Sequence, residues 1–233
     1  MSLLSLAQEV CHEIGIEPPT SIVNNEDDDA RRLLTLFNTE GKRLMRRYDW
    51  QELVTEATFT TIADENQGIL NTIVSEADVD RILPDTMYNR TDQRQREGAV
   101  GAETWQMDKA RNTNRLQWYF RVRGNSLLVN PVPAAGETMA FEYVSNKWAE
   151  SSDGSTKKAS FTADSDNPRI DEDILKLGVK WRLRAAIGAE FKPDMDEYME
   201  QLKLRFQADQ PAGLITMGDS LNDKVGVIIA RQA

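Results

Sequence analysis

Residues 27–62, DDDARRLLTLFNTEGKRLMRRYDWQELVTEATFTTI, change from a helical pattern to a strand pattern at Trp50. Before Trp50, apolar and small residues recur in alternating steps of four and three, which is the spacing of one helix face: Ala30, Leu34, Phe37, Gly41, Leu44 and Tyr48. Acidic residues open this segment and basic residues close it, as the helix dipole favours. After Trp50 the residues are largely β-branched. The stretch therefore predicts a helix over 27–48 and a strand over 52–62.

Helical patterns return at both ends of the chain. Residues 2–15 have apolar residues at helical spacing, with Ser2 as a capping residue and Gly15 as a stop. Asp171 is expected to cap a helix whose first turn is acidic, and 194–208 form another helix after a break at 192–194. The residues expected to face inward from these last two helices are Ile174, Leu177, Gly178, Trp181, Ala185, Gly188, Met195, Tyr198, Met199, Leu202 and Phe206.

The middle of the chain has short strand patterns. Residues 116–122 and 126–130 flank Arg123-Gly124-Asn125, which is typical of a hairpin, and 138–146 alternate as a strand. Weaker strand-like runs occupy 69–74 and 78–83, and 90–116 are expected to form a loop with a short helix.

Helices at both ends with strands between them predict an α+β fold. We expect a helical bundle from 1–50 and 170–212, an inserted small antiparallel β subdomain over 51–169, and an extended C-terminal arm over 213–233.

Composition excludes several classes of protein. The 233 residues have 28 Lys and Arg against 38 Asp and Glu, a net charge of −10, which argues against tight binding to duplex DNA. One Cys and one His exclude a disulfide framework and a multi-ligand zinc site. Apolar runs are too short for a membrane span, and the N-terminus does not resemble a signal peptide. We expect neither a membrane nor a cofactor to be involved.

Motifs for catalysis or metal binding are not evident. Residues 164–167 resemble the start of a calcium loop, but Arg169 stands where such a loop needs Gly, so a turn leading to Asp171 is expected. The acidic run 26–29 is interpreted as a solvated helix start rather than a cation site. We therefore expect no catalytic and no metal-binding residues.

A basic island contrasts with the acidic chain. Residues 81–124 hold nine Lys and Arg against five acids, a local charge of +4. Opposite charges on different segments allow contacts with a partner or with another copy of the chain. The alternative is a solvated surface that contacts no partner. The arginines predicted to contact an acidic surface are Arg90, Arg94, Arg96 and Arg111.

The C-terminal tail is the second candidate contact. It has β-branched residues that favour a strand: Val225, Val227, Ile228 and Ile229. Either this strand adds to the chain's own sheet, or it docks on a neighbouring protein by strand addition.

Several short segments follow one another in a characteristic order along the chain: Ile14 to Pro19, Tyr48-Asp49-Trp50, Leu83-Pro84-Asp85, Trp118-Tyr119, Leu127 to Pro131, Phe141-Glu142-Tyr143 and Asp171 to Arg182. In this order of features the chain resembles the head-to-tail adaptor proteins of tailed bacteriophages, the family that includes the tail tubular protein A of short-tailed phages. The resemblance covers roughly residues 2–210, and 86–116 depart most from it.

This resemblance implies a structural virion protein, commonly a ring of twelve copies that joins the portal protein to the tail or nozzle and lets DNA pass through its lumen. It implies no enzymatic activity, and a location in the virion neck after assembly in the host cytoplasm. An acidic lumen would repel DNA phosphates, which agrees with the net charge. The alternatives are a phage hydrolase or metal-dependent nuclease, and a chaperone or regulatory binding module.

Overall fold

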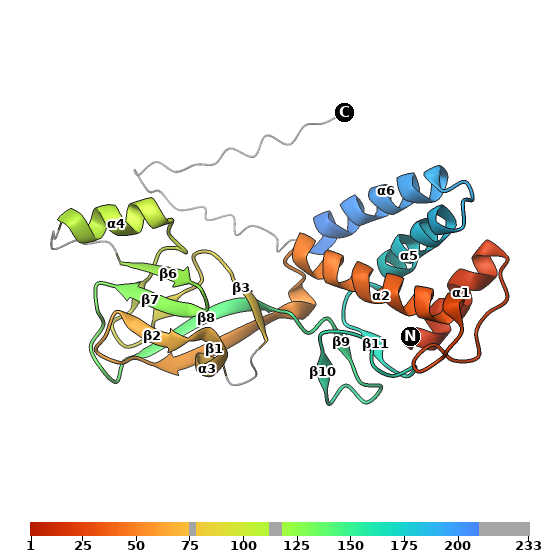
Figure 1. Ribbon diagram of the computed structural model, residues 1–233. Coiled ribbons are helices and arrows are strands. Elements are labelled where there is room, and N and C mark those ends of the chain that lie inside the picture. Colours follow the sequence, from red (N-terminus) through yellow and green to blue (C-terminus); the bar gives the residue numbers. More distant parts are fainter. Residues whose placement is uncertain (75–77, 112–117, 210–233) are drawn as a thin grey trace.

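The computed structural model describes residues 1–74, 78–111 and 118–209, and it shows a mixed α+β fold in two parts (Figure 1). The helical part contains four long helices and a small sheet: α1 (Leu3–Ile14), α2 (Asp28–Arg47), α5 (Glu172–Ala186), α6 (Lys192–Asp209), β9 (Ala149–Glu150), β10 (Lys157–Lys158) and β11 (Asn167–Pro168). The predicted α+β class is confirmed. No helix within the described ranges is both long and apolar enough to cross a membrane.

The sheet part contains the other elements. After a 3₁₀ turn at Gln51–Leu53 these are β1 (Val54–Thr60), β2 (Asn66–Ile69), α3 (Leu70–Ile73), β3 (Val79–Ile82), β4 (Tyr88–Asn89), β5 (Arg94–Gln95), α4 (Ala102–Arg111), β6 (Tyr119–Arg123), β7 (Ser126–Asn130) and β8 (Thr138–Ser145). β8 is the central strand, because it pairs with β1 along one edge and with β3 and β4 along the other. A second sheet has the order β2-β7-β6.

Local capping signals place the helix ends where the sequence predicts them. The Ser2 hydroxyl accepts a hydrogen bond from the Ser5 amide, and Gly15 ends α1 with φ of 81°, a left-handed conformation that glycine adopts without strain. The Asp171 carboxylate accepts a hydrogen bond from the Ile174 amide at 3.0 Å. The helices predicted over 2–15 and from Asp171 are therefore confirmed.

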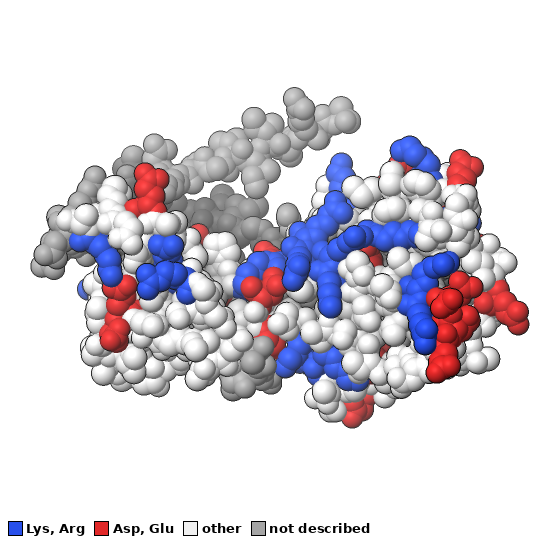
Figure 2. Space-filling view, viewed as in Figure 1, with Lys and Arg blue, Asp and Glu red and all other residues white. Residues whose placement is uncertain are grey.

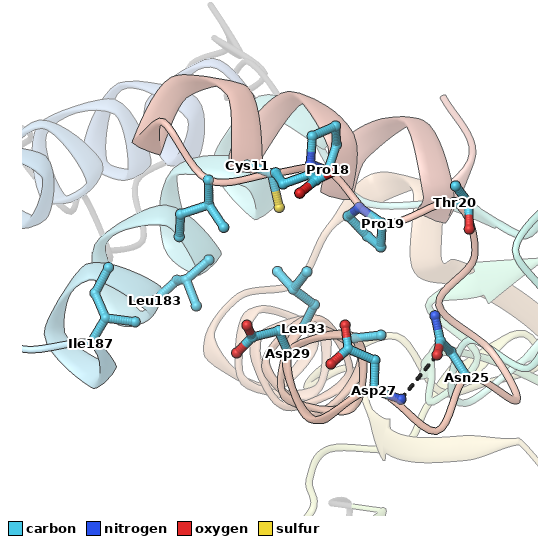
Figure 3. A pocket seen from close by; sticks show the side chains of 13 residues that line it. Cys11, Pro18, Pro19, Thr20, Asn25, Asp27, Asp29, Leu33, Leu183 and Ile187 are labelled. Atoms are coloured by element: carbon cyan, nitrogen blue, oxygen red, sulfur yellow. Dashed lines mark hydrogen bonds between the residues drawn. The ribbon is translucent and has the colours of Figure 1, made fainter.

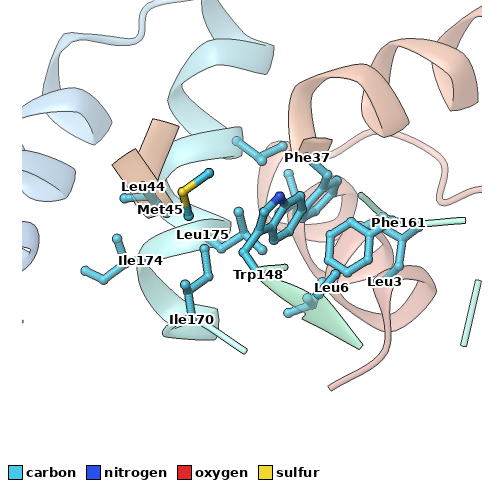
Figure 4. Close-up of a cluster of buried hydrophobic side chains, with 14 of the residues drawn as sticks. Leu3, Leu6, Phe37, Leu44, Met45, Trp148, Phe161, Ile170, Ile174 and Leu175 are labelled. Atoms are coloured by element: carbon cyan, nitrogen blue, oxygen red, sulfur yellow. The ribbon is translucent and has the colours of Figure 1, made fainter. Parts of the chain in front are cut away.

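The helices of the helical part are arranged around α5, which packs against α1, α2 and α6. Trp148 and Phe161, which precede and follow the β9–β10 hairpin, enter the same hydrophobic core (Figure 4). The fully buried members of this core include Leu3, Leu6, Phe37, Leu53, Val144, Trp148 and Leu175. Packing of the small sheet and its loops into this core means that the helical part is built from more than the chain ends.

Two glycines allow the close approach of polar and aromatic groups in this core. A Cβ atom at Gly41 would lie 2.3 Å from the ring of Trp148, and one at Gly178 would lie 2.5 Å from the carboxylate of Glu40. Glu40 is fully buried. It accepts a hydrogen bond of 2.6 Å from the Tyr198 hydroxyl and pairs with Arg182 at 2.8 Å. This buried charge is therefore paired, as burial requires.

The predicted inward face of α5 is only partly correct. Ile174 and Gly178 are buried, but the rest of the buried face is Leu175, Val179 and Leu183, while Gly188 is exposed. The buried stripe is rotated because α5 is enclosed by three helices. On α6, Tyr198 and Leu202 are buried as predicted, whereas Met199 is exposed.

The sheet part has its own core, formed where the two sheets contribute side chains. It includes Met87, Phe120, Leu127, Val129, Met139 and Phe141, all fully buried or nearly so. The hairpin of β6 and β7 is confirmed, with Arg123 opposite Ser126 across a two-residue turn. The strand predicted over 69–74 is wrong: β2 ends at Ile69 and the following four residues form the short helix α3.

Residues 164–166 form a turn, as predicted, and not a calcium loop. This turn holds the first residues of α1 in place. The backbone carbonyls of Asp164 and Asp166 accept hydrogen bonds from the amides of Leu4 and Leu3, which lack partners within α1. The Asp164 carboxylate accepts from the amide of Ile22, and that of Asp166 from the amides of 162 and 163.

The boundaries of the β subdomain that the sequence predicts over residues 51–169 stay a prediction. The predicted arm over 213–233 lies outside the described residues.

Candidate interaction surfaces

The β4–β5 hairpin carries three of the four predicted arginines. Asn89 shapes its turn: the side-chain oxygen accepts hydrogen bonds from the amides of Thr91 and Asp92, and the side-chain amide donates to Glu137 at 2.6 Å. The Arg90 side chain is 54% exposed and pairs with Glu56 on β1. Arg94 on β5 is also exposed.

Arg96 does not lie on the surface. Its side chain is fully buried, its guanidinium lies 3.5 Å from the ring centroid of Trp118, and it pairs with Asp92 at 3.7 Å. Burial lowers the pKa of Arg96 to about 10, although the charge of Asp92 raises it. A buried cation on an aromatic face is a structural contact. We therefore do not include Arg96 in the surface that the sequence predicted for a partner.

Ion pairs neutralise part of the basic island. Arg81 pairs with Asp49 at 2.5 Å, and Lys109 pairs with Glu65 at 2.5 Å. Arg94 forms no ion pair within the described ranges, and its guanidinium lies 5.1 Å from the Trp118 ring. Arg111 ends α4, and the predicted tail residues lie outside the described ranges: Val225, Val227, Ile228 and Ile229. The structure thus brings Arg90 and Arg94 together on one hairpin.

The C-terminal half of α2 presents a second basic surface, whose residues were expected from the sequence only to balance the helix dipole. Its residues, called here the basic face of α2, are Lys42, Arg43, Arg46 and Arg47. All are exposed, and none forms an ion pair with a described carboxylate. Figure 2 shows Lys and Arg side chains gathered over this end of α2 and acidic side chains at the opposite end. The spacing i, i+1, i+4, i+5 was the available signal, since it places all four on one side of a helix.

A pocket of about 400 Å³ lies between α1, α2, α5 and the loop after α1, at the other end of α2 (Figure 3). Its apolar walls include Pro18, Pro19, Leu33 and Leu183, and its acidic residues are Glu17, Asp27 and Asp29. Cys11 also lines it, and burial raises the pKa of this thiol, with a further contribution from Asp29. A raised pKa keeps the thiol protonated and weakly nucleophilic. Because of its three carboxylates, this pocket is called the acidic pocket below. Carboxylates beside apolar walls suit the binding of a cation.

Metal-ligand geometry is not found in the described ranges, where no three His, Cys, Asp or Glu side chains are placed to hold a metal ion. The two candidate surfaces among the described residues therefore lie at opposite ends of α2: the basic face near its C-terminus, and the acidic pocket that α1, α5 and the loop after α1 complete near its N-terminus.

The family model described as SU10 adaptor protein matches residues 1–217. The chain belongs to the SU10 adaptor protein family. No curated protein matches the chain. Membership in the SU10 adaptor family confirms the resemblance to phage head-to-tail adaptors. This SU10 adaptor is thus a structural phage protein of a family that is not an enzyme family, and its role is in the assembly of head and tail proteins in the virion.

Proposed function

We propose that this SU10 adaptor forms a ring between the portal protein and the tail or nozzle protein, and that DNA passes through the lumen of the ring. The observation that carries the proposal is the family match over residues 1–217. The ring size expected from the resemblance is twelve copies. The helical part would lie against the portal and the sheet part would face the tail.

Charge supports this role. A net charge of −10 disfavours retention of DNA through neutralised phosphates, so we expect DNA to pass without being held. The cations of the chain are concentrated on particular surfaces instead, which suits contacts with acidic protein surfaces. Arg90, Arg94 and Arg111 are proposed as one such contact, and Val225 to Ile229 of the tail as another.

The experiment is an assembly assay with phage that lacks the gene. We expect DNA-filled heads without tails, and expect purified protein to restore tail attachment and to be found in the finished virions. A variant with Arg90→Glu, Arg94→Glu and Arg111→Glu should fold normally and fail to restore attachment, because surface changes usually alter stability by under about 0.5 kcal/mol. Normal tails in the absence of the protein would refute the proposal.

Absence of catalysis is part of the same proposal. Purified protein is expected to show no peptidoglycan hydrolase, nuclease or esterase activity with Mg²⁺, Mn²⁺ or Zn²⁺. Turnover that a single carboxylate substitution abolishes would favour the alternative, a phage hydrolase or metal-dependent nuclease.

A further inference from the structure

We propose that the basic face of α2 in one copy docks on the acidic pocket of a second copy, with a Lys or Arg side chain entering that pocket. The inference deepens the proposed function, because it names the surfaces through which copies of the adaptor would join. The contact between copies rests on the proposed ring only for its role in the virion.

The basic face is held on a rigid scaffold. Tyr48, which follows α2, stacks on Phe206 of α6 with ring centroids 4.4 Å apart, and its hydroxyl donates to the Phe206 carbonyl at 2.9 Å. Trp50 donates from its indole nitrogen to the Leu44 carbonyl at 2.9 Å. The last turns of α2 are therefore fixed while their four cations stay exposed. A helix whose backbone is already fixed loses less entropy when it binds.

The acidic pocket matches the two halves of a long basic side chain. Lys and Arg bury their aliphatic stems along apolar surfaces while the charged head stays among polar groups. The walls at Pro19, Leu33 and Leu183 offer the apolar surface, and Glu17, Asp27 and Asp29 offer carboxylates. Within the described residues Glu17 and Asp27 form no ion pair, while Asp29 has an exposed one with Arg32 at 3.3 Å. A guanidinium can bind a carboxylate through two parallel hydrogen bonds.

The two surfaces cannot meet within one copy. They lie at opposite ends of a helix of 20 residues, and such a helix is about 30 Å long. A patch whose complement lies elsewhere on the same molecule joins copies head to tail, which closes into a ring when the rotation between copies allows it. A second copy of the chain complements both surfaces. A nucleic acid would complement the basic face alone, because the carboxylates of the acidic pocket repel phosphates.

The test exchanges charges between the two surfaces. Variant one is Arg43→Glu with Arg46→Glu, and variant two is Glu17→Lys with Asp27→Lys. Masses are measured by analytical ultracentrifugation and native mass spectrometry over a range of concentrations. Wild type should self-associate, less so in 1 M than in 0.1 M salt because salt screens exposed charges. Each variant alone should be at least tenfold weaker in association.

An equimolar mixture of the two variants should recover association, with the variants alternating, because each then supplies the surface that the other lacks. The matched control is Arg121→Glu with Arg123→Glu on β6, which makes the same change in net charge away from both surfaces and should associate like wild type. Circular dichroism and melting curves check that every variant folds.

Three outcomes would overturn the inference: a wild type that stays monomeric at all concentrations, a first variant that associates like wild type, or a mixture that stays dissociated. Loss of binding to a DNA duplex in the first variant, with association intact, would assign the basic face to nucleic acid instead. The proposed function fails separately, if the protein is absent from virions while the charge exchange behaves as expected.

Discussion

Replacing Gly41 with alanine tests the closest contact in the helical part. The added Cβ would lie 2.3 Å from two ring atoms of Trp148, far inside ordinary van der Waals separation. Trp148 cannot move away without loss, because it is fully buried and its indole nitrogen donates to the Ala159 carbonyl at 2.9 Å. Its ring also meets Phe161 edge-on, with centroids 4.8 Å apart.

The expected cost follows from three effects. Overpacking a core costs about 1–3 kcal/mol, and an indole N–H left without a partner costs about 1–3 kcal/mol more. Alanine in a helix recovers about 1 kcal/mol relative to glycine. The free energy of unfolding should therefore fall by about 3 kcal/mol. For a protein of this size that lowers the melting temperature by about 6–12 °C.

The assay is urea unfolding followed by circular dichroism, together with melting curves, for Gly41→Ala in two backgrounds. In wild type it should destabilise by the amount above. In Trp148→Phe the outer ring atoms are gone, so the same substitution should be neutral or should stabilise by up to about 1 kcal/mol. Equal destabilisation in both backgrounds would show that the contact with Trp148 is not the cause.

Three further predictions concern single groups and the tail. Arg96→Ala should lower the melting temperature clearly, because it empties a buried site over Trp118, whereas Arg94→Ala on the exposed side should change it little; similar effects of both would contradict the burial. Burial raises the pKa of the Asp166 carboxyl, but hydrogen bonds to the carboxylate, first from Lys158, outweigh burial and lower the pKa overall. The stabilisation that this carboxylate contributes is therefore present above the unfolded pKa near 4, and it is lost as the pH falls through the lower folded pKa. The stability difference between wild type and Asp166→Asn, from urea unfolding, should therefore shrink below about pH 4, and a difference independent of pH would count against it. Deleting 219–233 should leave the melting temperature nearly unchanged but abolish ring or portal binding, measured by ultracentrifugation, while an unfolded product would place the tail in the chain's own sheet.

Features with local causes could be predicted from the sequence. The caps at Ser2 and Asp171 and the turn of the β6–β7 hairpin depend on a few neighbouring residues. The helix of α2 depends on a periodic pattern over many residues. In contrast, the apolar run 69–74 suggested a strand because its residues favour one, whereas the partner strand β7 pairs only as far as Ile69.

The candidate sites were predictable only in part, because they depend on contacts between distant segments. Arg96 is buried against Trp118, and nothing in the sequence around Arg96 indicates that contact. The acidic pocket unites Cys11, Pro19, Leu33 and Leu183 from separate segments. The basic face of α2 was visible in the sequence, but the helix dipole offered a sufficient explanation for it. Only the surroundings of each side chain separate a surface cation from a structural one.

The pairing of β1 with β8 has a mechanical consequence. The chain passes between its two parts at Leu53 and again after Ser145, and the two crossing strands are hydrogen-bonded to each other from Val54 opposite Val144 onward. A paired ribbon resists bending and twisting more than a single linker does. Tension that pulls the two parts away from each other would draw β8 lengthwise past β3 and β4. Because the hydrogen bonds between these strands are perpendicular to the strand direction, they would share the load and would not open one by one. The ribbon can therefore carry force between the parts without yielding at a hinge.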